Sequence, residues 1–149
     1  MESRGDLASW SAAASSLWAK SSLEENAWLP LVQHLDDSAG VAGVLWDRWL
    51  PEQTKRFITQ AISGDDADGR ALACWLAGVH DVGKSSPAFA CVVPELAEAT
   101  RKAGGDLSPQ AQRDRKRAPH GAVGEWALAT WLQDAHGARP RVAASYAAV

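Results

Sequence analysis

Apolar residues that recur every three or four positions are the feature that most constrains how this chain can fold. The clearest run lies between Pro30 and Pro51 and consists of Leu31, Leu35, Ala39, Ala42, Leu45, Trp46 and Trp49. An α-helix has 3.6 residues per turn, so residues at this spacing share one face. Proline is tolerated at the start of a helix and disfavours its continuation. The pattern therefore predicts one long helix between the two prolines.

The same spacing predicts helices along most of the chain. We expect a first helix on Leu7, Trp10, Ala14, Leu17 and Trp18, a third around residues 57–62, and a fourth that ends at Val79. Short helices are expected after Pro87 and Pro94, and a last one from His120 to His136, stopped by Gly137. Residues 106–119 are polar and are interpreted as a long mobile loop, and no strand is expected. The fold class is therefore predicted to be all-α, a helical bundle.

Composition narrows the class of protein further. The 149 residues are 46% hydrophobic and 22% charged, which is typical of one soluble globular domain. The net charge of -3 gives no overall nucleic-acid signature, so any DNA contact would need a local basic patch. The only clustered candidates are Arg113, Arg115, Lys116 and Arg117. We expect reduced thiols in a cytoplasmic protein, no signal peptide, no membrane contact, and eight tryptophans that mostly fill the core.

The predicted fourth helix ends in an unusual group of polar residues, His80-Asp81-Val82-Gly83-Lys84. An imidazole and a carboxylate can bind a metal ion, and a lysine ammonium can reach a phosphate oxygen. Gly83 is expected to let the backbone turn sharply behind them. The order therefore indicates a divalent metal site that acts on phosphate.

Two further histidines, His34 and His120, lie in other predicted helices. A lone buried histidine is more often a packed core residue than a ligand, so these two are candidates only because the His80-Asp81 pair exists. Mixed histidine and carboxylate ligands suit iron, manganese, nickel or cobalt, with magnesium or zinc as further candidates. We expect one or two such ions, with the metal site among the helices.

These residues resemble a known family. His34, the run from His80 to Lys84, and His120 on an all-helical frame are similar to the HD superfamily of metal-dependent phosphohydrolases. The resemblance is sharpest to the HD nuclease domain of the CRISPR-associated helicase-nuclease of type I systems. The segments that carry it are Leu17–Ser21, Trp28–Asp37, Ala39–Trp46, Leu76–Lys84, Ser86–Phe89 and Pro119–Gly121.

The resemblance implies a nuclease that degrades DNA, chiefly single-stranded, in antiviral CRISPR interference. It also implies a helicase that feeds strand to the nuclease and an RNA-guided surveillance complex that recruits both. By position, His34, His80 and Asp81 would be metal ligands and His120 would serve a second metal. Asp81 and Lys84 would be catalytic, with Lys84 facing the scissile phosphate. The basic residues at 113–117 would contact the DNA.

In that family the nuclease domain continues into a further histidine pair and a later aspartate, and a helicase follows. Neither precedes Val149, so residues 1–149 are interpreted as an HD-type nuclease domain incomplete at its C-terminus, with weak or absent catalysis. Two alternatives use the same residues or the same frame. One is an HD phosphohydrolase that acts on nucleotides or cyclic nucleotides, and the other is a non-catalytic helical interaction module.

Overall fold

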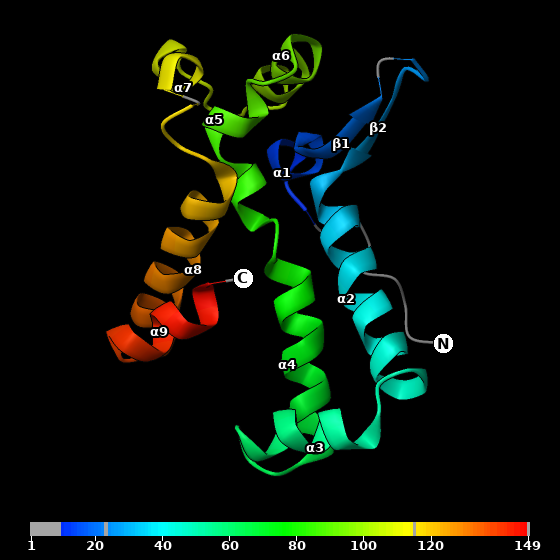
Figure 1. The fold of residues 1–149 in the computed structure, drawn as a ribbon. Helices are drawn as coiled ribbons and strands as arrows, with labels where there is room; N and C mark the ends of the chain where they lie inside the picture. Colours follow the sequence, from blue (N-terminus) through cyan, green and yellow to red (C-terminus); the bar gives the residue numbers. More distant parts are fainter. Residues whose placement is uncertain (1–9, 23, 115, 149) are drawn as a thin grey trace. The chain divides into compact units, whose positions relative to one another are not determined.

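The computed structural model describes residues 10–22, 24–114 and 116–148 (Figure 1). The chain forms two compact units. The smaller unit is one continuous segment, Leu35–Val79, and the larger unit combines the chain up to His34 with His80–Val149. The residues that sequence analysis selects as metal ligands all belong to the larger unit.

Helices dominate both units, so the all-α prediction is confirmed. The smaller unit contains α3 (Glu52–Gln60), α4 (Asp66–Val79) and most of α2 (Leu31–Arg48). The larger unit contains α1 (Ala12–Ser16), β1 (Trp18–Ser22), β2 (Ala27–Pro30), the 3₁₀ turn η2 (Val82–Ser85), α5 (Pro87–Ala90), α6 (Pro94–Lys102), α7 (Pro109–Asp114), α8 (His120–His136) and α9 (Pro140–Ala147).

The three long helices follow the sequence closely. Helix α2 ends three residues before Pro51, and α4 stops at Val79, immediately before the His80-Asp81 pair. Helix α8 spans the predicted range and ends at Gly137, whose φ of 63° is the left-handed conformation that glycine adopts without strain. Asp66 and Asp68 lie in the first turn of α4, where their negative charge interacts favourably with the positive end of the helix dipole.

The prediction that the chain has no strand is wrong for residues 18–30. β1 and β2 form an antiparallel hairpin in which Ser21 pairs with Trp28 and Ser22 pairs with Ala27. The turn between them uses Asn26 at a φ of 48°, a conformation that asparagine tolerates better than most residues. Consequently the expected first helix is shorter, since α1 covers Ala12–Ser16 and Trp18 begins a strand. Leu7 lies outside the described residues.

Two more elements differ from the sequence-based expectation. Part of the expected loop at residues 106–119 is helical, because α7 forms at Pro109–Asp114. Leu107, just before it, is buried in an apolar cluster with Ala90, Cys91 and Ala97. The short helix α9, which packs against α8, was not expected. These segments lack a long apolar period, and contacts with neighbouring elements decide their structure.

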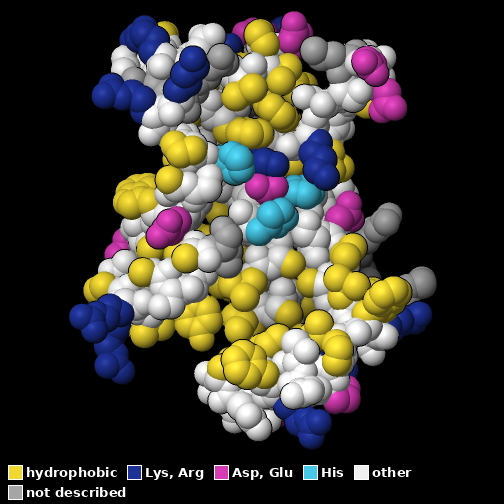
Figure 2. All heavy atoms as spheres, in the orientation of Figure 1, with side chains coloured by type: hydrophobic (Ala, Val, Ile, Leu, Met, Phe, Trp, Pro, Cys, Tyr) yellow, Lys and Arg dark blue, Asp and Glu magenta, His cyan; other side chains and the backbone are white. Residues whose placement is uncertain are grey.

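The interpretation of the tryptophans as core residues is correct for two of them. Trp18 and Trp46 are only 5% and 2% exposed. The exposed tryptophans are Trp10, Trp28, Trp49, Trp126 and Trp131. Figure 2 shows hydrophobic side chains spread over the visible face rather than confined to the interior.

The smaller unit is built around Trp46. A Cβ atom at Gly69 on α4 would lie 2.8 Å from the Trp46 ring, so only glycine fits this close approach of the two helices. The indole Nε1 of Trp46 donates a hydrogen bond to Asp66 at 3.4 Å. At the exposed surface of the same unit, Arg70 donates two hydrogen bonds of 2.9 Å to Asp47. None of the described helices in either unit has the length and apolar character needed to cross a bilayer.

Candidate metal centre

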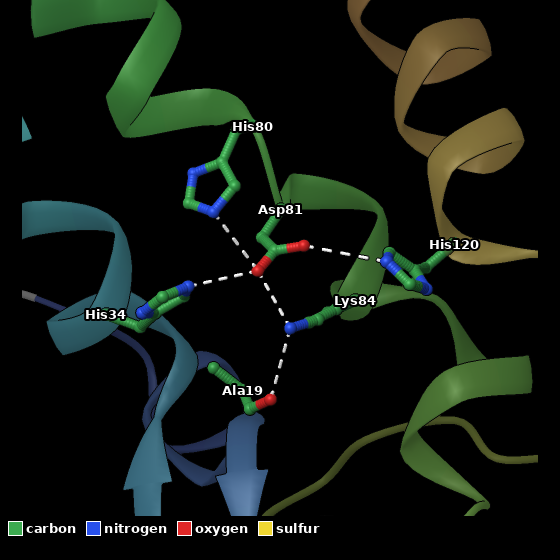
Figure 3. Close-up of polar contacts among 6 residues, drawn as sticks. All are labelled: Ala19, His34, His80, Asp81, Lys84 and His120. Carbon is green, nitrogen blue, oxygen red and sulfur yellow. Dashed lines mark hydrogen bonds and ion pairs between the residues drawn. The ribbon is translucent and has the colours of Figure 1, made fainter. Parts of the chain in front are cut away.

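Separate segments of the larger unit bring five polar side chains to one point (Figure 3). His34 comes from the first turns of α2, and His80 and Asp81 from the junction between α4 and η2. Lys84 comes from η2 itself, and His120 is the first residue of α8. The structure therefore brings together every candidate ligand that the sequence indicates.

The start of α2 is fixed by the hairpin. The backbone amide of Leu31 donates to the carbonyl of Leu17 at 2.8 Å, directly before β1, and the Leu31 side chain is 3% exposed. His34 follows three residues later, about one helical turn on, and therefore lies on nearly the same face as Leu31. Its side chain is only 12% exposed and points toward Asp81 (Figure 3).

Gly83 brings η2 against the start of α8. A Cβ atom at this position would lie 2.6 Å from the backbone nitrogen of Gly124 and still closer to the carbonyl oxygen of His120. Backbone atoms cannot move aside as a flexible side chain can, so the residue must be glycine. The α-helix does end just before this segment, but φ of Gly83 is not among the positive values in this chain, so the structural reason for glycine here is close packing.

Asp81 is the centre of the cluster. Its Oδ2 atom lies 3.0 Å from His34 Nε2, 3.2 Å from His80 Nε2 and 2.7 Å from Lys84 Nζ. Its Oδ1 atom faces the other way, 3.6 Å from His120 Nε2. The two oxygens of this carboxylate thus lie next to different histidines.

Lys84 is held in place on two sides. In addition to the Asp81 carboxylate, its ammonium donates to the carbonyl oxygen of Ala19 in β1 at 3.2 Å, and its side chain is 13% exposed. Burial by itself raises the pKa of Asp81, but hydrogen bonds from Lys84 and His34 outweigh it and leave the pKa below its ordinary value. Asp81 is therefore an anion at neutral pH and can bind a cation.

The donor set fits a divalent metal. His34, His80 and Asp81 each offer a ligand atom, and these atoms lie within 4.8 Å of one another. We call these three residues the metal triad. Two imidazoles and one carboxylate are ligands that iron, manganese, nickel, cobalt and zinc accept. Figure 2 shows histidine side chains gathered around an acidic and a basic side chain at the molecular surface, where a substrate could reach them.

The residues that surround the cluster were not predicted from the sequence. Phe89 on α5 contacts both the His120 ring and the Lys84 ammonium, and Trp18 stacks on Phe89. The backbone carbonyl of Ala19 was also not anticipated as a partner of Lys84. The only signal in the sequence was that all three residues fall in segments that carry the family resemblance.

The basic residues at 113–117 are placed only in part. Arg113 lies on α7 and donates to Gln110 at 2.7 Å, and Lys116 and Arg117 are exposed between α7 and α8. Arg115 lies outside the described residues. Helix α7 packs against α5, the helix that carries Phe89.

Comparison with known proteins gives consistent matches over this fold. A curated CRISPR-associated nuclease/helicase Cas3 from Streptococcus thermophilus is 47% identical over 78 residues, which is 48% of this chain and 8% of that protein. A CRISPR-associated endonuclease/helicase Cas3 from Thermus thermophilus is 36% identical over 92 residues, 62% of this chain and 10% of that protein. The matched part is thus no more than about a tenth of either relative.

A solved structure described as a crystal structure of a CRISPR-associated protein is 34% identical, with a TM-score of 0.75. The match covers 91% of this chain and 15% of that one. The family model described as Cas3, HD domain, matches residues 18–149, which include every residue of the metal triad as well as Lys84 and His120. The chain therefore belongs to the Cas3 HD domain family.

Proposed function

We propose that this chain is the metal-dependent nuclease domain of a protein that cleaves single-stranded DNA in CRISPR interference. The observation that carries the proposal is the metal triad, whose ligand atoms lie within 4.8 Å of one another. The family membership supports nuclease chemistry at this site, since two relatives are described as a nuclease/helicase and an endonuclease/helicase. The activity would belong to a cytoplasmic defence system against invading DNA.

His34, His80 and Asp81 would hold a divalent ion, and His120 would serve a second. Iron, manganese, nickel and cobalt fit the ligands best, with magnesium and zinc as further candidates. A bound ion would supply Lewis acidity, so that water can attack a phosphodiester at neutral pH. The role of the protein is to orient the imidazoles and to keep the Asp81 carboxylate ionised.

Lys84 would contribute positive charge beside the reacting phosphate. Its ammonium lies 2.7 Å from Asp81, so a phosphate that approached the triad would also approach this cation. Fixed positive charge stabilises a phosphorane-like transition state more than the substrate, because negative charge builds up there during attack. Lys84 and Asp81 are therefore the proposed catalytic residues.

The DNA strand would be a substrate that the basic residues Arg113, Arg115, Lys116 and Arg117 hold by its phosphates, without reading its sequence. The relatives that match are nuclease/helicase proteins, which supports a helicase domain as a partner. The RNA-guided surveillance complex is the proposed second partner, since the relatives are described as CRISPR-associated.

The test compares metal content and cleavage of single-stranded DNA in the unsubstituted protein and in Asp81→Ala. We expect that loss of this ligand removes the bound manganese or nickel and lowers cleavage by at least about 100-fold, more than loss of an indirect contact does. Asp47→Ala is the matched control, because Asp47 is an exposed carboxylate in the smaller unit that pairs with Arg70. It should keep both properties.

Unchanged cleavage in Asp81→Ala would refute the proposed site. Faster hydrolysis of nucleotides than of single-stranded DNA would replace the nuclease with a nucleotide phosphohydrolase. If the unsubstituted protein retains no metal after loading, the metal-dependent mechanism is refuted for these residues, and the result favours a non-catalytic helical interaction module.

A further inference from the structure

Phe89 contacts two residues of the site at once. Its ring centroid lies 5.5 Å from that of His120, and the two ring planes are nearly perpendicular at 70°. The Lys84 ammonium lies 5.6 Å from the same centroid. Phe89 itself has no group that can bind a metal or transfer a proton, so any contribution must act through these neighbours.

The Phe89 ring is fixed by its own surroundings. The Trp18 ring packs on it with a centroid separation of 4.5 Å, and the Trp18 indole donates to the carbonyl of Ala90 at 3.4 Å. The backbone nitrogen of Phe89 donates to the Ser86 hydroxyl at 3.3 Å, which caps α5. Trp18 and Ser86 are both buried. The ring is therefore a rigid surface for the residues that touch it.

The His120 ring is only weakly held by Asp81. Its side chain is 44% exposed, and its Nε2 atom lies 3.6 Å from Asp81 Oδ1, longer than a well-formed hydrogen bond. In the described part of the chain, the edge-to-face contact with Phe89 is the other interaction of this ring. Aromatic pairs favour this geometry, and a cation is attracted to an aromatic face. Phe89 thus restricts both the His120 imidazole and the Lys84 ammonium.

We propose that Phe89 is a positioning residue, which holds the His120 imidazole next to Oδ1 of Asp81 and the Lys84 ammonium next to Oδ2. Its effect on catalysis rests on the proposed function, but its effect on the His120 ring does not. The general precedent is that groups behind the ligands orient them and tune the site.

The structural test uses the metal-free 149-residue chain with isotope-labelled histidines. Phe89→Leu should shift the ring signals of His120, because the ring current of Phe89 no longer acts on them. His136 is an internal reference. Its ring packs against Trp131, with 4.4 Å between the ring centroids, so its signals should not respond to a substitution at Phe89. Phe57→Leu is the matched control, because Phe57 is the other of the two phenylalanines and is 77% exposed in the smaller unit.

Unchanged His120 ring signals in a folded Phe89→Leu protein would overturn the proposal. If that variant does not fold, the same question is answered in the unsubstituted chain by magnetisation transfer between the ring protons of Phe89 and His120. A cross-peak supports the contact, and its absence overturns it.

The functional test measures turnover of single-stranded DNA and metal content together. We expect Phe89→Leu to lower kcat by about 10- to 100-fold with KM and the metal content of the triad little changed. Phe89→Tyr keeps the ring and should retain most of the activity. A purely structural role would instead lower the Tm and the metal content of Phe89→Leu in parallel with its kcat. If the unsubstituted chain has no nuclease activity but His120 still responds to Phe89→Leu, the proposed function fails and the positioning role stands.

Discussion

Two carboxylates in this protein are both ion-paired, and the difference between them shows which one belongs to a site. Asp47 is about half exposed and forms one bidentate ion pair with Arg70. Asp81 is 14% exposed and faces three histidines and a lysine. A surface ion pair adds little to stability. A partly buried carboxylate that has several cationic or hydrogen-bonding partners is typical of a functional site.

The regions around the two carboxylates differ in the same way. In the smaller unit, Asp47, Trp46 and their partners all come from one 45-residue segment, Leu35–Val79. In the larger unit, Asp81 collects partners from His34 to His120. The smaller unit is therefore held by contacts that are close in sequence, and the centre around Asp81 by contacts that are distant.

The largest expected effect on stability separates the two regions. Trp46→Ala should lower the free energy of unfolding by about 3–5 kcal/mol, because it leaves a cavity against Gly69 and removes the partner of Asp66. The measurement is urea unfolding followed by circular dichroism. Trp49→Ala is the control, since Trp49 lies on the exposed surface just after the same helix and is 80% exposed.

The metal content of folded Trp46→Ala shows whether metal binding depends on the stability of the smaller unit. If it does not, the variant should bind as much manganese as the unsubstituted protein at temperatures well below its unfolding transition. A parallel loss of metal would show that the two regions depend on each other.

A smaller effect is expected at the glycine behind the site. Gly83→Ala should destabilise the fold by about 1–3 kcal/mol, because the added methyl group would meet the backbone of His120 and Gly124. It should also weaken metal binding, since η2 carries Lys84 and follows Asp81. Thermal unfolding and metal titration measure the two effects.

Gly40→Ala is the matched substitution in the smaller unit. Gly40 lies inside α2 with nothing within 4 Å of its added Cβ, so alanine should stabilise the helix by about 0.5–1 kcal/mol. Equal changes in Tm at both glycines would contradict the close approach of η2 and α8.

The smallest expected effect concerns acid. The pKa values of Asp81 and Asp47 are both lowered in the folded protein, so the unfolded chain binds more protons as the medium becomes acidic. Each carboxylate therefore contributes stability above the ordinary aspartate pKa of about 4, and this contribution is lost as the pH falls through the lowered folded value. Stability of the chelated protein should accordingly decline over that window.

Substitution by asparagine distinguishes the two groups. Asp81→Asn should flatten the decline more than Asp47→Asn, and about 1 M salt should abolish the contribution of the exposed Asp47 first. The measurement is urea unfolding at a series of acidic pH values. A larger flattening of the acid decline in Asp47→Asn than in Asp81→Asn would contradict the stronger interactions inferred for Asp81.

The sequence predicted the long helices because their signals are local. The apolar period of α2, the acidic start of α4 and Gly137 after α8 each depend on residues within a few turns. The hairpin could not be predicted in the same way. Trp18 continues the apparent period of a helix, and its burial against Phe89 and Ala90 favours a strand instead.

The candidate site was predictable in its residue types but not in its arrangement. The motif that contains His80 and Asp81, with the family resemblance, pointed to the convergence that the structure displays. The close packing at Gly83 was not predictable, because its neighbours are 37 or more positions away at His120 and Gly124. The tether from Lys84 to Ala19 likewise depends on a distant backbone atom.

The contact of Gly83 with the start of α8 has a consequence for how this site can vary. It joins the two ends of a long excursion of the chain, so the backbone contact at Gly83 acts together with the Phe89 ring in setting the distance from His120 to Asp81. Residues inserted at the exposed Gly104, which follows α6 and precedes the buried Leu107, would enlarge an already closed loop, at about 0.6 kcal/mol for each doubling of its length. This turn is therefore the natural place to graft a label or a linker, because it lies outside α7, the buried Leu107 and the basic residues at 113–117.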